Sequence, residues 1–136
     1  MSVLVLCVGR LKEDFWEAAE AEYQKRLRRY ADVKVREVKD EAALVAAIPP
    51  RASLVALDRR GDLVTSEALA REILAGLPQV AFAIGGAEGL GDELRARARR
   101  IIAFGRITLP HRLARVLLLE QIYRGFSILR GDPYHK

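Results

Sequence analysis

Three short and almost wholly apolar runs constrain the fold of this chain more than any other feature. They are Val3–Val8 (VLVLCV), residues 53–57 (SLVAL) and residues 79–84 (QVAFAI), and a segment with helical periodicity follows each of them. A strand that is apolar on both faces is typical of a parallel sheet covered by helices on both sides. The alternation of strands and helices therefore predicts a single α/β domain over residues 1–136, with a mostly parallel sheet and right-handed crossovers.

The other elements of this α/β pattern have weaker signals. We expect two further strands, an alternating one at residues 33–38 (VKVREV) and a fifth at residues 105–109 (GRITL). The first helix is expected to begin at Asp14, which forms a capping-box-like pair with Glu17. Further helices are expected at residues 40–48, 65–76, 92–100 and 113–129.

The composition, 51% hydrophobic and 30% charged, is that of a soluble globular protein. The first apolar run has no basic lead-in and is too short for a signal peptide or a membrane span. Cys7 is the only cysteine, which excludes an internal disulfide and suits a reducing cytoplasm. The net charge of +5 raises the expectation of a nucleic acid or another phosphate-rich partner. We therefore expect a cytoplasmic protein with no membrane partner and no metal site.

Three of the predicted strands end in unusual loops, at residues 57–61 (LDRRG), 85–91 (GGAEGLG) and 108–112 (TLPHR). In an open parallel sheet these ends lie at one edge, where ligands bind. Glycines in such a loop let a ligand approach the main chain without a Cβ in the way, although a turn alone also favours them. Neither GxGxxG nor GxxxxGK[ST] is present. The sequence thus predicts one ligand site that is neither a dinucleotide fold nor a P-loop.

Five blocks of the sequence, in order, resemble one bacterial enzyme family. They are residues 8–27 (VGRLKEDFWEAAEAEYQKRL), 54–61 (LVALDRRG), 84–90 (IGGAEGL), 107–124 (ITLPHRLARVLLLEQIYR) and 132–136 (DPYHK). These blocks are similar to the large-subunit ribosomal RNA pseudouridine N3-methyltransferases, which belong to the SPOUT (α/β-knot) superfamily. The resemblance extends over nearly the whole chain.

This resemblance implies a Rossmann-like sheet whose C-terminal part is threaded into a deep trefoil knot. It also implies a homodimer that binds S-adenosyl-L-methionine in the knot, near the subunit interface. The implied reaction is methylation of N3 of a pseudouridine in 23S ribosomal RNA, with naked RNA, the large subunit or the assembled ribosome as substrate. The predicted cofactor-binding residues are Leu57, Gly85, Gly86, Gly105, Arg106, Ile107, Thr108, Leu109 and Pro110.

Three residues are candidates for the catalytic step. N3 carries a weakly acidic proton that must leave, so a general base or an electrostatic stabiliser is expected. His111 follows the predicted cofactor loop, although it can equally cap the next helix or bind a backbone carbonyl. Tyr134 and His135 belong to the tail, which we expect to fold over the site; the alternative is a disordered end.

Charged residues elsewhere have both structural and functional interpretations. Glu120 stands in an apolar stretch and is expected to pair with Arg124, four residues on, or with Arg115. Arginines cluster at residues 25–29, at residues 95–100 (RARARR) beside the glycine loop, and at Arg112 with Arg115. Each cluster is either a solvated helix face or a docking surface for RNA phosphates.

Two other functions remain open from the residues alone. One is an α/β-knot methyltransferase that modifies a different RNA, such as transfer RNA. The other is a catalytically silent module that binds the ribosome. Retention of both the glycine loop and the TLPH loop favours an enzyme, because a pure binding module does not need them together.

Overall fold

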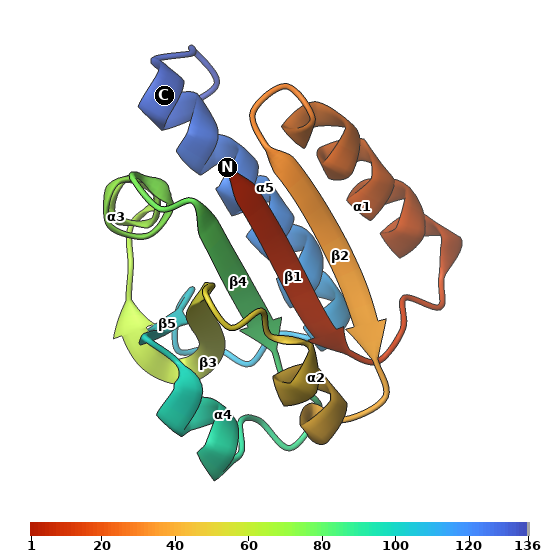
Figure 1. Cartoon of the computed structure of the whole chain (residues 1–136). Coiled ribbons are helices and arrows are strands. Elements are labelled where there is room, and N and C mark those ends of the chain that lie inside the picture. Colours follow the sequence, from red (N-terminus) through yellow and green to blue (C-terminus); the bar gives the residue numbers. More distant parts are fainter. Residues whose placement is uncertain (136) are drawn as a thin grey trace.

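The computed structural model describes residues 1–135 and consists of a five-stranded parallel sheet with helices on both faces (Figure 1). The strand order is β2-β1-β4-β3-β5, and every neighbouring pair is parallel. The strands are β1 (Ser2–Val8), β2 (Asp32–Val38), β3 (Ser53–Leu63), β4 (Gln79–Ile84) and β5 (Arg100–Ala103). The predicted α/β class is confirmed, whereas the trefoil knot stays a prediction.

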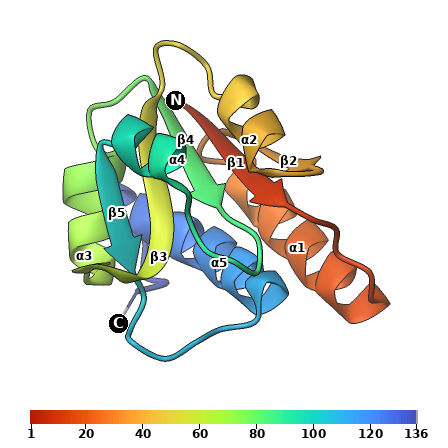
Figure 2. The ribbon, with the colours of Figure 1, turned by 90° about the horizontal axis from the view of Figure 1, so that it is seen from below.

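Helices form one layer on each side of the sheet (Figure 2). One layer contains α1 (Asp14–Leu27), α5 (His111–Arg130) and the short α3 (Ser66–Ala68), which continues into the π-helical segment η1 (Leu69–Leu74). The other layer contains α2 (Glu41–Ala47) and α4 (Asp92–Arg97). Each layer packs against one face of the apolar strands, which explains why those strands lack polar positions.

The two cores meet the central strands from opposite sides. Phe82 on β4 packs in the core beneath α1, η1 and α5, whereas its neighbour Ala83 faces Leu44 of α2 and Leu94 of α4. All four side chains are fully buried. Cys7 is buried in the same way, and burial raises the pKa of its thiol to about 12, as expected for a residue that acts as a small hydrophobe.

The fifth strand lies earlier in the chain than predicted. Residues 100–103 pair with β3, while the predicted strand at residues 105–109 is a loop. Gly105 has φ +140°, a conformation that takes the chain out of the sheet immediately after β5. Because β5 already begins at Arg100, α4 ends at Arg97, and the predicted helix over residues 92–100 is too long by three residues.

Two other local predictions are corrected. Glu13, not Asp14, is the N-cap of α1, and it makes no side-chain capping bond, so the predicted capping box is absent from this helix. The strand β3 does not end at Leu57 but continues to Leu63, with a register shift against β5 between Leu57 and Asp62. The intervening residues bulge out of the ladder, which keeps the LDRRG segment beside the end of β4.

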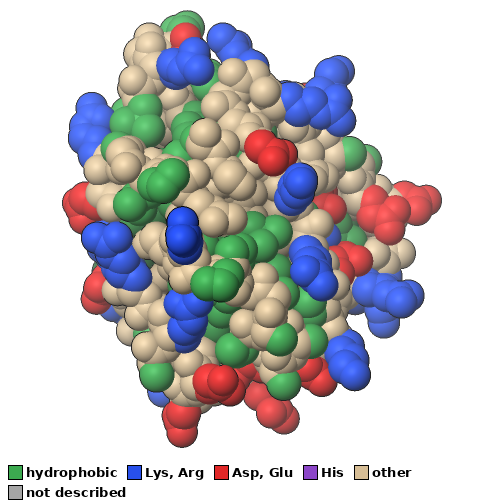
Figure 3. All heavy atoms as spheres, viewed as in Figure 1, with side chains coloured by type: hydrophobic (Ala, Val, Ile, Leu, Met, Phe, Trp, Pro, Cys, Tyr) green, Lys and Arg blue, Asp and Glu red, His purple; other side chains and the backbone are tan. Residues whose placement is uncertain are grey.

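The helix α5 runs antiparallel to the strands, from their carboxyl ends to their amino ends (Figure 1). Gly131, in the left-handed conformation with φ +73°, ends it. On the face shown in Figure 3, basic side chains predominate near the top, where α1 and α5 end, and acidic ones near the bottom, below α4. Within residues 1–135, no helix is both long enough and apolar enough to cross a membrane.

Candidate functional site

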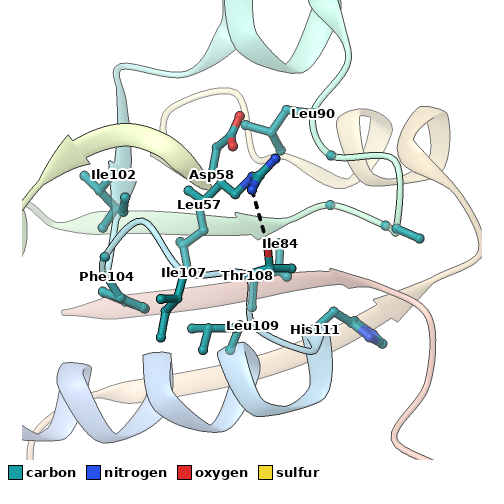
Figure 4. A pocket seen from close by; sticks show the side chains of 18 residues that line it. Leu57, Asp58, Ile84, Leu90, Ile102, Phe104, Ile107, Thr108, Leu109 and His111 are labelled. Atoms are coloured by element: carbon teal, nitrogen blue, oxygen red, sulfur yellow. Dashed lines mark hydrogen bonds between the residues drawn. The ribbon is translucent and has the colours of Figure 1, made fainter.

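A cleft of about 220 Å³ opens at the carboxyl edge of the sheet, where the three unusual loops meet (Figure 4). Residues 57–59 in the middle of β3 and the ends of β4 and β5 form its floor, and the loop between β5 and α5 forms its outer wall. Its apolar lining comes from Leu57, Ile84, Leu90, Ile102, Phe104, Ile107 and Leu109. The convergence predicted from the strand order is thus confirmed.

The glycine-rich segment after β4 forms a tight turn at the rim of the cleft. The N–H of Gly89 donates to the carbonyl of Gly86 at 3.1 Å, and Gly89 has φ +80°. A Cβ at Gly85 would lie 2.8 Å from the carbonyl oxygen of Gly89, so the turn itself excludes a side chain there. A Cβ at Gly86 would meet only Val8, at an ordinary 3.4 Å. The fold therefore requires Gly85, whereas Gly86 leaves an open approach to the main chain.

The loop at residues 104–110 is held against the bulge of β3 by two arginines. Arg106 donates to the carbonyls of Arg59 and Gly61, the latter at 2.7 Å. Arg59 in turn donates to the Thr108 hydroxyl at 3.3 Å, the dashed line in Figure 4. These bonds give the loop, which has no secondary structure, a defined position over the cleft.

Most of the predicted cofactor-binding residues come together at this cleft. The ones that line it are Leu57, Gly85, Gly86, Gly105, Ile107, Thr108 and Leu109. Arg106 and Pro110 do not line it: the side chain of Arg106 turns to the β3 carbonyls, and Pro110 is the N-cap of α5. Arg106 therefore holds the loop in place and does not line the cleft, which its place in the sequence does not reveal.

His111 is the first residue of α5 and lies at the rim of the cleft. Its imidazole points away from the centre of the cleft (Figure 4), and Nε2 lies 3.2 Å from the position of a Cβ built on Gly9. This nitrogen is buried and has no hydrogen-bond partner within residues 1–135. Burial, followed by the charges of Arg112 and Arg115, lowers the pKa of His111. His111 does not cap α5, because Pro110 is the N-cap, so that interpretation is wrong.

Asp58 is a charged residue of the cleft that the sequence reasoning did not single out. Its carboxylate forms an ion pair with Arg95 of α4 and accepts the N–H of Arg60 at 3.2 Å. Burial acts to raise the pKa of Asp58, but these hydrogen bonds outweigh it and the pKa is lowered. The sequence signal for Asp58 was its position directly after the apolar run of residues 53–57.

The tail lies at the other end of α5 and does not cover the cleft of its own chain. The Tyr134 hydroxyl donates to Glu120 at 2.8 Å, and its ring packs edge-on against Tyr123. His135 contacts Arg124 through Nδ1 at 3.0 Å and Glu67 through Nε2 at 2.6 Å. An arginine can only donate, so Nδ1 accepts and Nε2 carries the hydrogen donated to Glu67. The last residue of the DPYHK motif, residue 136, lies outside the described residues.

The predicted pairing of Glu120 is confirmed. Arg124 donates to it through Nε and Nη2, at 3.2 and 2.8 Å. Arg115 is engaged elsewhere: it is 2% exposed and bonds to Glu20 of α1 and Glu37 of β2. It therefore cannot belong to a surface that docks RNA.

The other arginine clusters are divided by the fold. Of the run at residues 95–100, Arg95 reaches the edge of the cleft, while Arg100 begins β5 at the far end and pairs with Glu72 at 2.9 Å. The side chain of Arg112 donates to the carbonyl of Arg10. Within residues 1–135, no group of three potential metal-ligating side chains is present.

A parallel α/β sheet with a glycine-bordered cleft beyond its strand ends is typical of α/β proteins that bind small molecules. The family model described as "Predicted SPOUT methyltransferase" matches residues 1–135. The chain belongs to this family and is a methyltransferase by family. It is also similar to the solved structure of a probable methylase family protein from Haemophilus influenzae Rd KW20, with 12% identity and a TM-score of 0.63, over 98% of this chain and 70% of that one. That likeness bears on the fold alone.

Proposed function

We propose that this protein transfers a methyl group from S-adenosyl-L-methionine to N3 of a pseudouridine in 23S ribosomal RNA. The observation that carries the proposal is the cleft, which combines the glycine turn and the 104–110 loop in a member of the SPOUT family. The match of the DPYHK tail and the TLPH loop to the pseudouridine methyltransferases supports this RNA target.

The residues of the cleft suit S-adenosyl-L-methionine. Apolar side chains such as Leu57, Ile107 and Leu109 offer walls for an adenine ring, and the open main chain at Gly86 offers N–H and C=O groups for polar atoms. When bound, the cofactor supplies an electrophilic methyl group. The chain's own contribution is to align the reactants and exclude water from a preorganised site.

We propose that the protein is a homodimer, because one chain does not bring all the predicted catalytic residues together. The 20 residues of α5 span about 30 Å and separate His111 from the tail. The cleft of one chain, of about 220 Å³, is also smaller than the roughly 300 to 1,000 Å³ usual for ligand sites, and a second subunit at its open side would enlarge the enclosed volume.

The outer face of α5 is suited to such a dimer. Leu113 near the start of α5 is 38% exposed, and Ile107, a loop residue that lines the cleft, is 73% exposed, so both apolar side chains are available for burial against a second copy. A two-fold contact pairs the same patch of each copy. Antiparallel packing of the two α5 helices would bring the tail of each copy to the cleft of the other, with Tyr134 and His135 next to the acceptor base.

The proton on N3 must be accepted as the methyl group is transferred. The lowered pKa of His111 favours the neutral form that a base needs, but its Nε2 faces Gly9 and the ring would have to rotate to reach a substrate. His135 of the second copy, with its nitrogens held by Arg124 and Glu67, would have to leave those partners. We propose the two histidines as acceptors of this proton. Tyr134 is not a base, because its pKa is raised to about 12 and its hydroxyl carries a proton; we propose that it positions the acceptor base.

Two measurements test the proposed function. Calorimetry should detect binding of S-adenosyl-L-methionine to the purified protein, and no binding would favour a silent ribosome-binding module. Mass spectrometry of ribosomal RNA from cells lacking this protein should reveal loss of one methyl group on a 23S pseudouridine. Loss of a methyl group from transfer RNA instead would move the activity to another RNA.

A further inference from the structure

The ends of α1 and α5 together form a strongly basic surface at the edge of the sheet opposite the cleft. We call it the basic end; it comprises Lys25, Arg26, Arg28, Arg29 and Arg130, all exposed. Only two of these five cations form an ion pair with a carboxylate within residues 1–135: Arg26 pairs with Glu22 at 2.7 Å, and Arg29 with Asp132 at 3.6 Å. The other three form no ion pair within residues 1–135.

Tyrosine rings organise the guanidinium groups of the basic end. Arg29 and Arg130 lie over the ring of Tyr30, at 5.0 and 5.7 Å from its centroid. Arg26 lies over Tyr23 at 5.2 Å. A guanidinium held on an aromatic face loses rotamer freedom before any ligand arrives, and its in-plane donors match phosphate oxygens. The basic end is therefore more ordered than a set of freely solvated side chains.

Three arginines at the cleft are, by contrast, engaged within the chain. Arg95 pairs with Asp58, Arg59 donates to Thr108, and Arg106 donates to two carbonyls of β3. An RNA-modifying enzyme needs positive charge to hold the phosphate backbone. The basic end offers more uncommitted charge than these three arginines do.

The basic end is also continuous with the tail. Tyr30 packs against Tyr123 with ring centroids 5.6 Å apart, and Tyr123 packs against Tyr134 at 4.7 Å. A molecule lying on the basic end would therefore reach the tail through one row of aromatic rings.

We propose that the basic end binds the phosphate backbone of the RNA substrate. This inference rests on the proposed function, because it takes RNA as the substrate. In the proposed dimer the tail of one copy lies at the cleft of the other, so the basic end of that copy borders the same cleft. RNA would then be held by one subunit while the other subunit methylates it.

The test compares two triple variants with matched charge loss. The first, Lys25→Ala/Arg28→Ala/Arg130→Ala, removes the three unpaired cations of the basic end. The control, Arg36→Ala/Arg51→Ala/Arg71→Ala, removes three exposed cations that form no ion pair within residues 1–135 and lie on other elements. Binding of protein-free 23S ribosomal RNA is measured by filter retention at several salt concentrations. Thermal unfolding of both variants checks that they remain folded.

The first variant should bind the RNA at least about tenfold more weakly, and the slope of log K against log salt should fall by about 2, since each lost phosphate contact removes roughly 0.7 to 0.9. The control should keep the wild-type slope. Equal losses in the two variants, or no loss in the first, would overturn the proposal. If the wild-type protein binds S-adenosyl-L-methionine but binds 23S ribosomal RNA neither free nor within the large subunit or the assembled ribosome, the proposed RNA target fails as well.

Discussion

The guanidinium of Arg115 donates two hydrogen bonds, of 2.6 and 3.1 Å, to the carboxylate of Glu20, and only 2% of the Arg115 side chain is exposed. The same group donates to Glu37 at 2.8 Å, and Glu37 also accepts the N–H of Leu11. One side chain thus ties the start of α5 to α1, to β2 and to the loop after β1. Because His111 lies one helical turn before Arg115, this ion cluster positions the rim of the cleft.

Replacing Arg115 by Met should lower the free energy of unfolding by about 2 to 4 kcal/mol, because it leaves the largely buried Glu20 carboxylate without its partner. Arg26→Met breaks the solvent-exposed pair with Glu22 and should change the free energy of unfolding far less. Urea denaturation of both variants checks the difference. Similar losses in the two variants would mean that burial does not strengthen the Arg115 cluster.

Gly85 and Gly86 should respond differently to a methyl group. Gly85→Ala places Cβ 2.8 Å from the Gly89 carbonyl and should cost about 1 to 3 kcal/mol of stability through overpacking. Gly86→Ala meets only Val8, at 3.4 Å, and should fold normally. If the cofactor approaches the main chain here, Gly86→Ala and, more severely, Gly86→Val should weaken S-adenosyl-L-methionine binding in calorimetry. Unchanged affinity in Gly86→Val would make this glycine a turn residue only.

The partly buried imidazole of His111 predicts a dependence of stability on pH. Its pKa in the folded protein is lowered, whereas the unfolded chain takes up a proton near the ordinary value of about 6.5. Between these values the unfolded state binds more protons, so stability should decline as the pH falls below about 6.5. His111→Gln should remove this part of the decline. An NMR titration in which the His111 pKa lies at or above 6.5 would contradict the expectation.

Removing the tail should separate folding from catalysis. Deletion of residues 132–136 removes the hydrogen bonds from Tyr30 to Asp132 and from Tyr134 to Glu120, at a cost of about 1 to 2 kcal/mol. Methylation should fall by about a hundredfold, the scale for losing positioning or proton-transfer groups. Denaturation and single-turnover assays measure the two effects.

Mixing the truncated protein with Gly86→Val tests whether the tail acts on the partner's cleft. Each mixed dimer would contain one cleft with an intact glycine turn and an intact tail from the other chain. With random assembly, activity should recover to about a quarter of the wild-type value, because half of the dimers are mixed and each has one complete site. Two inactive proteins that stay inactive when mixed would place the tail and the cleft in the same subunit's site.

Hydrophobic pattern alone was enough to predict β1 and β4. The apolar runs VLVLCV and QVAFAI are long enough and β-rich enough to be strands, and a strand buried on both faces demands a covered parallel sheet. The convergence of the three loops followed from the same reasoning, since carboxyl ends of parallel strands share an edge. The family could likewise be inferred, because its motifs are contiguous blocks of sequence.

Only the tertiary structure decided which neighbouring segment became β5 and where the charged side chains found partners. RIIA and GRITL are both short and β-branched, and the choice between them depends on pairing with β3 and on the turn at Gly105. Arg115 and Arg124 lie in one helix, yet Arg115 is held by residues 78 and 95 positions away in the sequence and Arg124 by one only four positions away. The position of the tail also depended on distant contacts, because Asp132 bonds to Tyr30 and His135 to Glu67. Local patterns fix elements because backbone periodicity is local, whereas burial and ion pairing depend on contacts that form only when distant segments pack together.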